Sequence, residues 1–221
     1  MAERETERQP ATESVADWLA SRAGEYGGPV RRQVVDSIRQ LGAVDRATYE
    51  AIATTPTPAL DEPLRRLSRA ADKSKLWLAI AAGLAIGGGS AGRRAALRGT
   101  LAIGATSALV NLGIKPVSFR TRPDRAQAGV PGRRQVEMPG STSFPSGHSA
   151  SAFAFATAIS RDRPWAALAC GFLAAAVAYS RVHTGVHYPG DTVVGSLIGA
   201  STGLAVAGLL NHGSPIAQRR G

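Results

Sequence analysis

Five nearly uncharged stretches in the second part of the chain limit what it can fold into. They cover residues 76–92, 95–113, 149–160, 165–180 and 193–210, and they are rich in Ala and Gly. Several are shorter than the ~20 residues of a usual membrane-spanning helix, but small side chains let helices pack closely and shield one another. Five such stretches leave too little polar face for the alternative, a soluble all-helical core. We therefore expect an all-α, multi-span transmembrane helical bundle of about five spans.

The charge of the chain lies mostly outside these stretches. The formal net charge is +10 over 221 residues, which suits nucleic acid, anionic lipid or an anionic substrate. The apolar stretches favour membrane lipids and an anionic substrate, so no nucleic-acid partner is expected. A single cysteine, Cys170, excludes an intrachain disulfide and a structural zinc cluster. The first residues contain no apolar core of a cleavable signal peptide.

The polar region before the spans is expected to have two parts. Apolar residues recur at helical spacing from Val30 to Leu41, which predicts an amphipathic helix that ends near Gly42, and a second short helix follows at 44–53. Such helices either lie on the lipid surface or pack on their own protein. The expected organisation is a polar mobile tail at 1–28, amphipathic interfacial helices at 29–74, a transmembrane domain at 75–213 and a basic tail at 214–221.

Three stretches at the ends of the spans carry the residues from which a site can be built. Lys115 to Pro123 follows the second span, Pro145 to His148 opens the third, and Ser180 to Asp191 joins the fourth to the fifth. Because consecutive spans alternate in direction, the three stretches reach the same membrane face. The sequence therefore predicts one site to which all three contribute.

The first two stretches can bind an anion. Lys115 and Arg122 are two cations separated by six residues, although charges at the end of a span often only anchor it at the interface. Ser146 and Gly147 lie where a loop becomes a helix, and the free N–H groups and dipole of a helix N-terminus favour phosphate. Ser146 could equally be an ordinary helix cap. His148 could act as an acid or a base.

The third stretch adds a possible nucleophile. Arg181 can hold phosphate through two N–H groups. Asp191 follows His187 by four residues, so its carboxylate can fix one imidazole nitrogen and leave the other to attack phosphorus. His183 and His187 could be metal ligands, but the Thr, Gly and Pro around them disfavour a continuous helix and no Glu or Cys completes a zinc set. We expect His183 and His212 to be bystanders and the stretch to perform phosphoryl transfer.

The connection between the first two stretches is expected to cover the site. Residues 124–142 contain several Gly and Pro residues, which predicts a mobile lid. Arg133 and Arg134 within it could meet a lipid headgroup or stay in solvent.

Together the three stretches resemble the signatures KxxxxxxRP, PSGH and SRxxxxxHxxxD of the type 2 phosphatidic acid phosphatase superfamily, whose sites resemble those of vanadium haloperoxidases. Every signature position is present between residues 115 and 191. The resemblance implies an integral-membrane lipid phosphatase without a metal ion or other cofactor. Family members of this type commonly have six spans, whereas this chain has about five, with the amphipathic region in place of a sixth.

The resemblance also implies a role for each matched residue. His187 would be the nucleophile that forms a phosphohistidine, and Asp191 would orient it. His148 would protonate the leaving oxygen and then activate the water that hydrolyses the intermediate. The phosphoryl oxygens would be held by Lys115, Arg122, Ser146, Gly147 and Arg181.

The substrate class follows from the family and the membrane location, and two other functions stay open. Expected substrates are a polyprenyl phosphate or diphosphate, phosphatidic acid, or a polyprenyl-linked sugar phosphate of a kind used in bacterial cell-wall synthesis. A phosphotransferase would use the same residues. A non-catalytic basic scaffold on the membrane surface would explain the positive charge, but not two His and one Asp at this spacing. The oligomeric state is left open.

The side of the membrane on which the site lies is predicted from the N-terminal region. About 70 polar residues precede the first span and are easier to leave in the cytoplasm, which favours a cytoplasmic site in a bacterial plasma membrane. Basic residues at the opposite end favour the external face instead, because basic loops usually stay inside; they are Arg93, Arg94, Arg98, Arg161 and Arg163.

Overall fold

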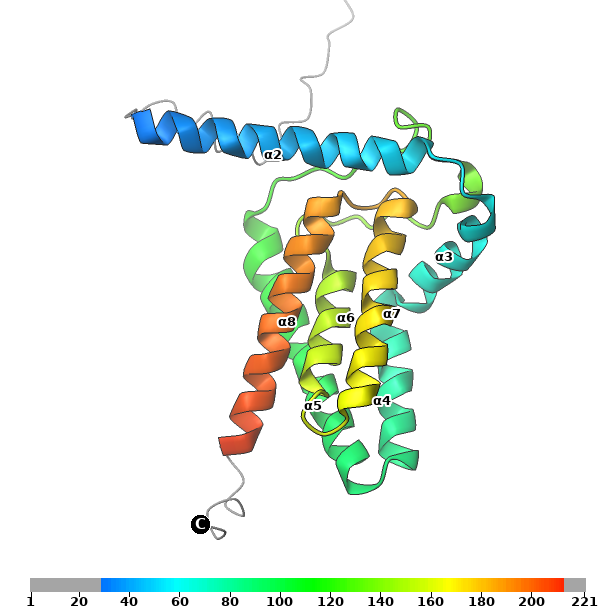
Figure 1. Cartoon of the computed structure of the whole chain (residues 1–221), viewed down its shortest axis with the longest axis vertical. Coiled ribbons are helices and arrows are strands. Elements are labelled where there is room, and N and C mark those ends of the chain that lie inside the picture. Colours follow the sequence, from blue (N-terminus) through cyan, green and yellow to red (C-terminus); the bar gives the residue numbers. More distant parts are fainter. Residues whose placement is uncertain (1–28, 213–221) are drawn as a thin grey trace, which may run out of the picture.

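The structure, a computed structural model, describes residues 29–212. All regular secondary structure in this part of the chain is helical (Figure 1). The α-helices are α2 (Pro29–Thr54), α3 (Pro58–Ala70), α4 (Lys75–Gly87), α5 (Gly89–Ala108), α6 (Gly147–Ala158), α7 (Pro164–His183) and α8 (Pro189–His212). The short turns are η1 (Asp72–Ser74), the π-helical turn η2 (Leu109–Ile114), η3 (Lys115–Val117) and η4 (Gly132–Arg134). The predicted tails at 1–28 and 214–221 lie outside the described residues.

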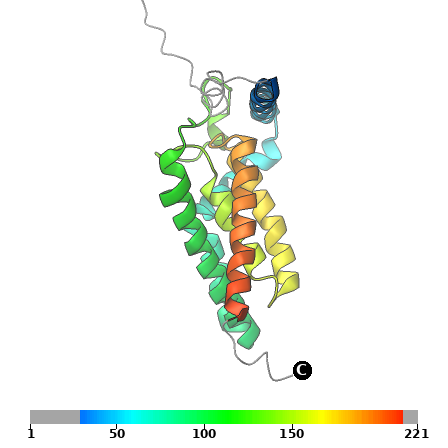
Figure 2. The same cartoon turned by 90° about the vertical axis from the view of Figure 1, so that its left-hand side faces the viewer.

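Helices α4 to α8 run side by side as a bundle, and α2 lies across one end of it (Figures 1 and 2). Helix α6 is in the centre, where most of its residues are buried. Phe155 of α6 packs on Trp77 of α4 with ring centroids 5.7 Å apart, and both side chains are fully buried. The all-α bundle that the sequence predicts is confirmed.

Small residues bring α8 unusually close to α6. Gly195, Gly199 and Gly203 recur every four residues on the face of α8 that touches α6. A Cβ atom at Gly195 would lie 2.5 Å from the carbonyl oxygen of Ser146, and one at Gly199 would lie 2.0 Å from that of Ala150. Only glycine permits this approach, as in other small-residue helix contacts in membranes. The contact draws the start of α8 against the start of α6.

Three of the helices in the described residues are long and apolar enough to cross a membrane. They are α5 with its continuation to Val117, α7, and α8 as far as Asn211. Helices α4 and α6 match two other predicted spans but have only 13 and 12 residues. A helix of 12 residues is about 18 Å long, less than the ~30 Å hydrocarbon core. Helix α6 tolerates this because protein, and not lipid, surrounds it.

The N-terminal region differs from the prediction in one respect. Helix α2 is continuous, so the expected break near Gly42 is wrong. A glycine inside a helix costs only about 1 kcal/mol, and the helix-forming residues on both sides outweigh it. Its C-terminal half packs on the bundle through Tyr49 and Ala53, each 3% exposed. Its N-terminal half extends beyond the bundle (Figure 1) and leaves Val34 and Leu41 52% and 69% exposed.

Candidate active site

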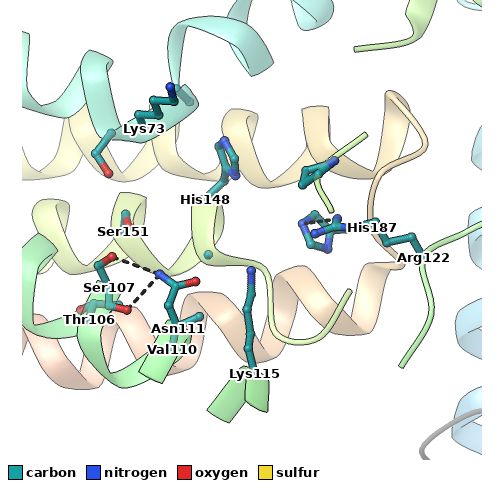
Figure 3. A pocket seen from close by; sticks show the side chains of 14 residues that line it. Lys73, Thr106, Ser107, Val110, Asn111, Lys115, Arg122, His148, Ser151 and His187 are labelled. Carbon is teal, nitrogen blue, oxygen red and sulfur yellow. Dashed lines mark hydrogen bonds between the residues drawn. The ribbon is translucent and has the colours of Figure 1, made fainter. Parts of the chain in front are cut away.

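The three stretches that the sequence singles out meet at the end of the bundle beneath α2. A cavity of about 180 Å³ opens there, lined by members of all three: Lys115, Arg122, Gly147, His148 and His187 (Figure 3). The predicted convergence on one site is thus found in the structure. Ser146, Arg181 and Asp191 lie directly behind this lining and are buried.

His187 is held through a serine as well as through its carboxylate partner. Its Nδ1 lies 3.5 Å from Asp191 Oδ2, at the outer limit of a hydrogen bond. Ser143 Oγ donates to the same carboxylate oxygen at 2.5 Å and lies 3.4 Å from His187 Nδ1. Ser143 therefore bridges the pair. The sequence does not single out Ser143, because a Ser in a loop of Ser and Thr residues carries no distinguishing signal.

The environment of His187 keeps its imidazole neutral. The ring is 1% exposed. Burial, with a smaller effect from the positive charge of Arg122, lowers the pKa of His187 to about 3, against the opposing effect of Asp191. At physiological pH the side chain is therefore uncharged, which is the form in which an imidazole can attack phosphorus.

Arg122 fixes the orientation of the other imidazole nitrogen. Its Nη1 donates to the carbonyl oxygen of Val186 at 2.8 Å and lies 3.3 Å from His187 Nε2. Its Nε donates to the carbonyl oxygen of Ser141 at 2.9 Å. A guanidinium can only donate, so Nε2 presents its lone pair and Nδ1 carries the proton. Lys115 joins this group through a 3.0 Å hydrogen bond from Nζ to Ser141 Oγ.

The start of α6 supplies a cap and a cavity wall. Ser146 is fully buried, and its Oγ accepts hydrogen bonds from Ser149 N at 3.4 Å and Ser149 Oγ at 3.1 Å. Its backbone N–H donates to the carbonyl oxygen of Asp191 at 3.0 Å. Ser146 therefore caps the helix and ties α6 to α8, while Gly147 and His148 line the cavity.

His148 and Arg181 both reach an acidic residue that the sequence did not single out. His148 Nε2 lies 2.7 Å from Asp72 Oδ1 in η1. Arg181 Nη1 lies 3.6 Å from the same oxygen and donates to Ser68 Oγ at 2.6 Å. In the sequence Asp72 is one acid within a basic lead-in to the first span, so no pattern marks it.

A second chain of contacts links α2 to the site. Arg120 Nη1 donates to Asp191 Oδ1 at 2.9 Å, and its Nη2 donates to Asp45 of α2. Asp45 also accepts a hydrogen bond of 2.6 Å from Gly190 N. The guanidinium lies over the ring of Tyr188, 4.3 Å from its centroid. Arg120 could have been noticed as a further cation between Lys115 and Arg122, but its partner in a distant helix could not.

Arg134 is a structural residue, contrary to both alternatives considered from the sequence, whereas the side chain of Arg133 is 60% exposed, in line with the solvent alternative. Arg134 is 1% exposed and donates from Nε to Asp61 at 2.7 Å and from Nη2 to the Thr55 carbonyl oxygen at 2.7 Å. Arg133 Nε donates to Asp61 at 2.5 Å. These contacts fasten the loop to α3, and His183 faces the same cluster, 3.3 Å from Asp61, away from the His187 ring.

Comparison with known proteins places this site in a family. Residues 95–212, more than half of the chain, match the family described as the PAP2 superfamily. The decaprenylphosphoryl-5-phosphoribose phosphatase of Mycolicibacterium smegmatis is 36% identical over 163 residues, which cover 72% of this chain and 83% of that protein. The protein of the same name from Mycobacterium tuberculosis is 37% identical over 98 residues, 42% of this chain and 49% of its own.

Two crystal structures share the fold. The first transmembrane PAP2 type phosphatidylglycerolphosphate phosphatase from Bacillus subtilis superposes with a TM-score of 0.62 at 23% identity, over 90% of this chain and 94% of that chain. Aquifex aeolicus LpxE superposes with a TM-score of 0.58 at 24% identity, over 74% and 94% of the respective chains. The predicted enzyme class, a phosphatase acting on lipid phosphates, is confirmed by the family and by the relative from Mycolicibacterium smegmatis. This integral membrane protein belongs to the PAP2 superfamily.

Proposed function

We propose that the protein hydrolyses a polyprenyl-linked phosphate through a phosphohistidine intermediate and without a metal ion. The observation that carries this proposal is the position of His187, which lines the cavity with its Nε2 3.3 Å from Arg122 Nη1. When phosphate binds, the guanidinium would turn to the phosphoryl oxygens and free the Nε2 lone pair for attack. A neutral, oriented imidazole next to fixed cations is what attack on a phosphate ester requires. Ser143 and Asp191 hold the opposite side of the ring.

The reaction would proceed in two balanced steps. In the first, the His187 Nε2–phosphorus bond forms while the bond from phosphorus to the leaving oxygen breaks, and His148 gives that oxygen a proton. In the second, a water oxygen bonds to phosphorus, the N–P bond breaks, and the water proton goes to His148. Lys115, Arg122 and Arg181 supply the positive charge that divalent cations supply in kinases.

A test of this proposal measures phosphate release from farnesyl phosphate by the purified protein in EDTA. We expect the rate in EDTA to stay within twofold of the rate in Mg²⁺, because three protein cations neutralise the phosphoryl oxygens. Dependence of the rate on added divalent metal would refute the metal-free mechanism. Release of the phosphoryl group only to an added alcohol, and not to water, would favour the phosphotransferase.

For the substrate, we propose a polyprenyl-linked sugar phosphate. The relatives from Mycolicibacterium smegmatis and Mycobacterium tuberculosis are named decaprenylphosphoryl-5-phosphoribose phosphatases. The cavity of this chain supports the same class, because it is polar on the side where the leaving group would lie. An in-line displacement puts the nucleophile and the leaving group on opposite sides of phosphorus. In Figure 3, hydroxyl and amide groups lie to one side of His148, and His187 and Arg122 lie to the other.

The polar side of the cavity is formed by five residues, Ser74, Thr106, Ser107, Asn111 and Ser151. Thr106 is fully buried, and its Oγ1 has no hydrogen-bond partner within the described part of the chain. A buried hydroxyl without a partner is costly at membrane depth, and a sugar hydroxyl would satisfy it. A plain hydrocarbon leaving group would favour an apolar wall here instead.

Thr106→Val is expected to separate these two substrate classes. Valine keeps the shape but removes the hydroxyl, and a hydrogen bond is worth about 0.5–1.5 kcal/mol. We expect kcat/KM for a polyprenylphosphoryl phosphoribose to fall about 5-fold and kcat/KM for farnesyl phosphate to change less than 2-fold. Thr100→Val is the matched control, because Thr100 lies exposed on the same helix and away from the cavity. Equal effects on both substrates would contradict the sugar assignment.

We also retain the proposals that α2 lies in the membrane interface and that the site faces the cytoplasm. Helix α2 lies across the bundle at the end where the cavity opens (Figures 1 and 2). Val34 and Leu41 are exposed and lie seven residues apart, on one face of α2, and such a face would contact the lipid surface in an interfacial amphipathic helix. Labelling of a cysteine introduced at Ala126 in spheroplasts with an impermeant reagent would contradict the cytoplasmic orientation.

A further inference from the structure

We propose that Asp72 is the positioning residue of His148 and serves it as Asp191 serves His187. The inference rests on the proposed function, because it assigns how the acid and base of that reaction is held. The site would then contain two His–carboxylate pairs, one for attack and one for proton transfer. Asp72 lies outside the three signature stretches and comes from η1, between α3 and α4.

The contact between these two side chains is short and direct. Asp72 Oδ1 lies 2.7 Å from His148 Nε2, whereas His187 and Asp191 are 3.5 Å apart. The His148 side chain is 20% exposed and that of Asp72 is 45% exposed, so the pair is partly shielded from water. The hydrogen bond from His148 lowers the pKa of Asp72, so the carboxylate is ionised at neutral pH.

The charges around His148 show why it needs the Asp72 carboxylate in order to act as a proton donor. The charged groups that face His148 are Asp72 from η1, Arg181 from α7 and Lys115 from η3. Two of the three are cations, and each disfavours a protonated imidazole. Among these groups only Asp72 stabilises the imidazolium that must form when His148 takes a proton from water.

The same contact decides which imidazole nitrogen transfers the proton. With Nε2–H donating to Asp72, Nδ1 is the nitrogen left for the reacting oxygens. In the first step its proton moves to the leaving oxygen as the P–O bond breaks. In the second step Nδ1 receives a proton from water as the new O–P bond forms. Asp72 keeps the ring in this orientation and stays ionised throughout, as carboxylates do when they orient a catalytic histidine.

The backbone around Asp72 is shaped to present it. Lys73 and Ser74, the next two residues, have left-handed φ values of 52° and 59°, which residues other than glycine rarely adopt. Such conformations cost of order 1–3 kcal/mol each and persist where the surrounding structure fixes them. This tight turn separates α3 from α4 and holds Asp72 over the start of α6. Both Lys73 and Ser74 line the same cavity.

The test compares Asp72→Asn with wild type on two substrates, farnesyl phosphate and p-nitrophenyl phosphate. The alkoxide that leaves farnesyl phosphate needs a proton, whereas p-nitrophenolate leaves readily without one. We expect the rate of His187 phosphorylation, measured in single turnover, to fall about 100-fold with farnesyl phosphate and less than 3-fold with p-nitrophenyl phosphate. The descending high-pH limb of the farnesyl phosphate profile should move to lower pH, because the charge that stabilises protonated His148 is gone.

Two further variants separate positioning from folding. Asp72→Glu keeps the carboxylate and should recover part of the lost rate with farnesyl phosphate. Glu62→Gln removes an acid that pairs with the partly buried Arg65 and the exposed Arg66 of α3 and should leave both rates unchanged. If Asp72→Asn damaged the fold instead, the rates with both substrates would fall equally, and Asp72→Glu would not restore the rate with farnesyl phosphate.

The outcomes that overturn the inference differ from those that overturn the proposed function. Equal effects of Asp72→Asn on both substrates, or none on either, would refute the role of Asp72 while His187→Ala remains inactive. An increase in kcat/KM would also refute it, because the carboxylate would then be competing with phosphate for His148 and Arg181. Phosphate release that persists in His187→Ala would refute the phosphohistidine mechanism itself.

Discussion

His187→Ala is expected to lower phosphate release from farnesyl phosphate by at least about 10⁴-fold, because the variant loses the atom that bonds to phosphorus. Alanine cannot accept from Arg122, and the only bond between enzyme and phosphoryl group disappears. The loss should be in kcat, with KM little changed, since the cations that hold the phosphate remain. Radiolabelled substrate quenched in alkali should leave label on wild-type protein and none on the variant.

Two other histidine variants make this result specific. His148→Ala should keep the label on the protein for longer than wild type when p-nitrophenyl phosphate is the donor, because the water that cleaves the N–P bond has lost its base. His212→Ala removes a histidine at the end of α8, outside the three signature stretches, and should label and turn over as wild type does. Alkali-stable label on His187→Ala would contradict the assignment of the nucleophile.

Arg120→Met is expected to destabilise the protein by about 3–5 kcal/mol, the usual cost of leaving a buried charge without its partner. Arg120 joins Asp45, whose side chain is 12% exposed, to Asp191, whose side chain is 0% exposed. Removing the guanidinium leaves two carboxylates close together in a poorly solvated place. The midpoint of thermal unfolding in detergent should fall by about 10 °C, and activity should fall with it because Asp191 supports His187.

Other substitutions show whether this loss comes from the link between α2 and the site. Adding Asp45→Asn to Arg120→Met should restore part of the stability. We expect the coupling free energy between the two substitutions to be at least about 1 kcal/mol. Arg94→Met is the matched control: its side chain is 57% exposed, and its partner Asp162 keeps Arg98 at 3.1 Å. The free energy of unfolding of that variant should fall by at most about 1 kcal/mol. Equal losses for the two arginine variants would mean that the α2 link has no special role.

The helical bundle was predictable because its signal is local. A run of apolar residues that ends in charged ones predicts a membrane helix wherever it occurs, and α7 and α8 agree with the predicted spans to within four residues at either end. The lengths of α4 and α6 were less certain, because a helix covered by protein need not match the thickness of the bilayer. The continuity of α2 was misjudged because Gly42 carries a small local penalty that its neighbours outweigh.

The core of the site was predictable for a different reason. Lys115, Arg122, His148 and His187 have fixed spacings at the ends of spans, and alternation of the spans brings those ends to one side. Residues that support the site from outside these stretches had no such signal. Asp72, Ser143 and Asp45 are separated from the histidines or the arginine they serve by 76, 44 and 75 positions.

The sequence by itself determined an all-helical membrane protein, the family, and the three stretches whose side chains gather at one cavity, because these depend on composition and on spacing along the chain. Tertiary structure alone decided how the side chains are held: Ser143 between His187 and Asp191, Asp72 on His148, and α2 joined to the site through Arg120. The physical reason is that hydrogen bonds and ion pairs act over a few ångströms. Only the packing of α6 against α8 and η1 brings such distant residues within that range.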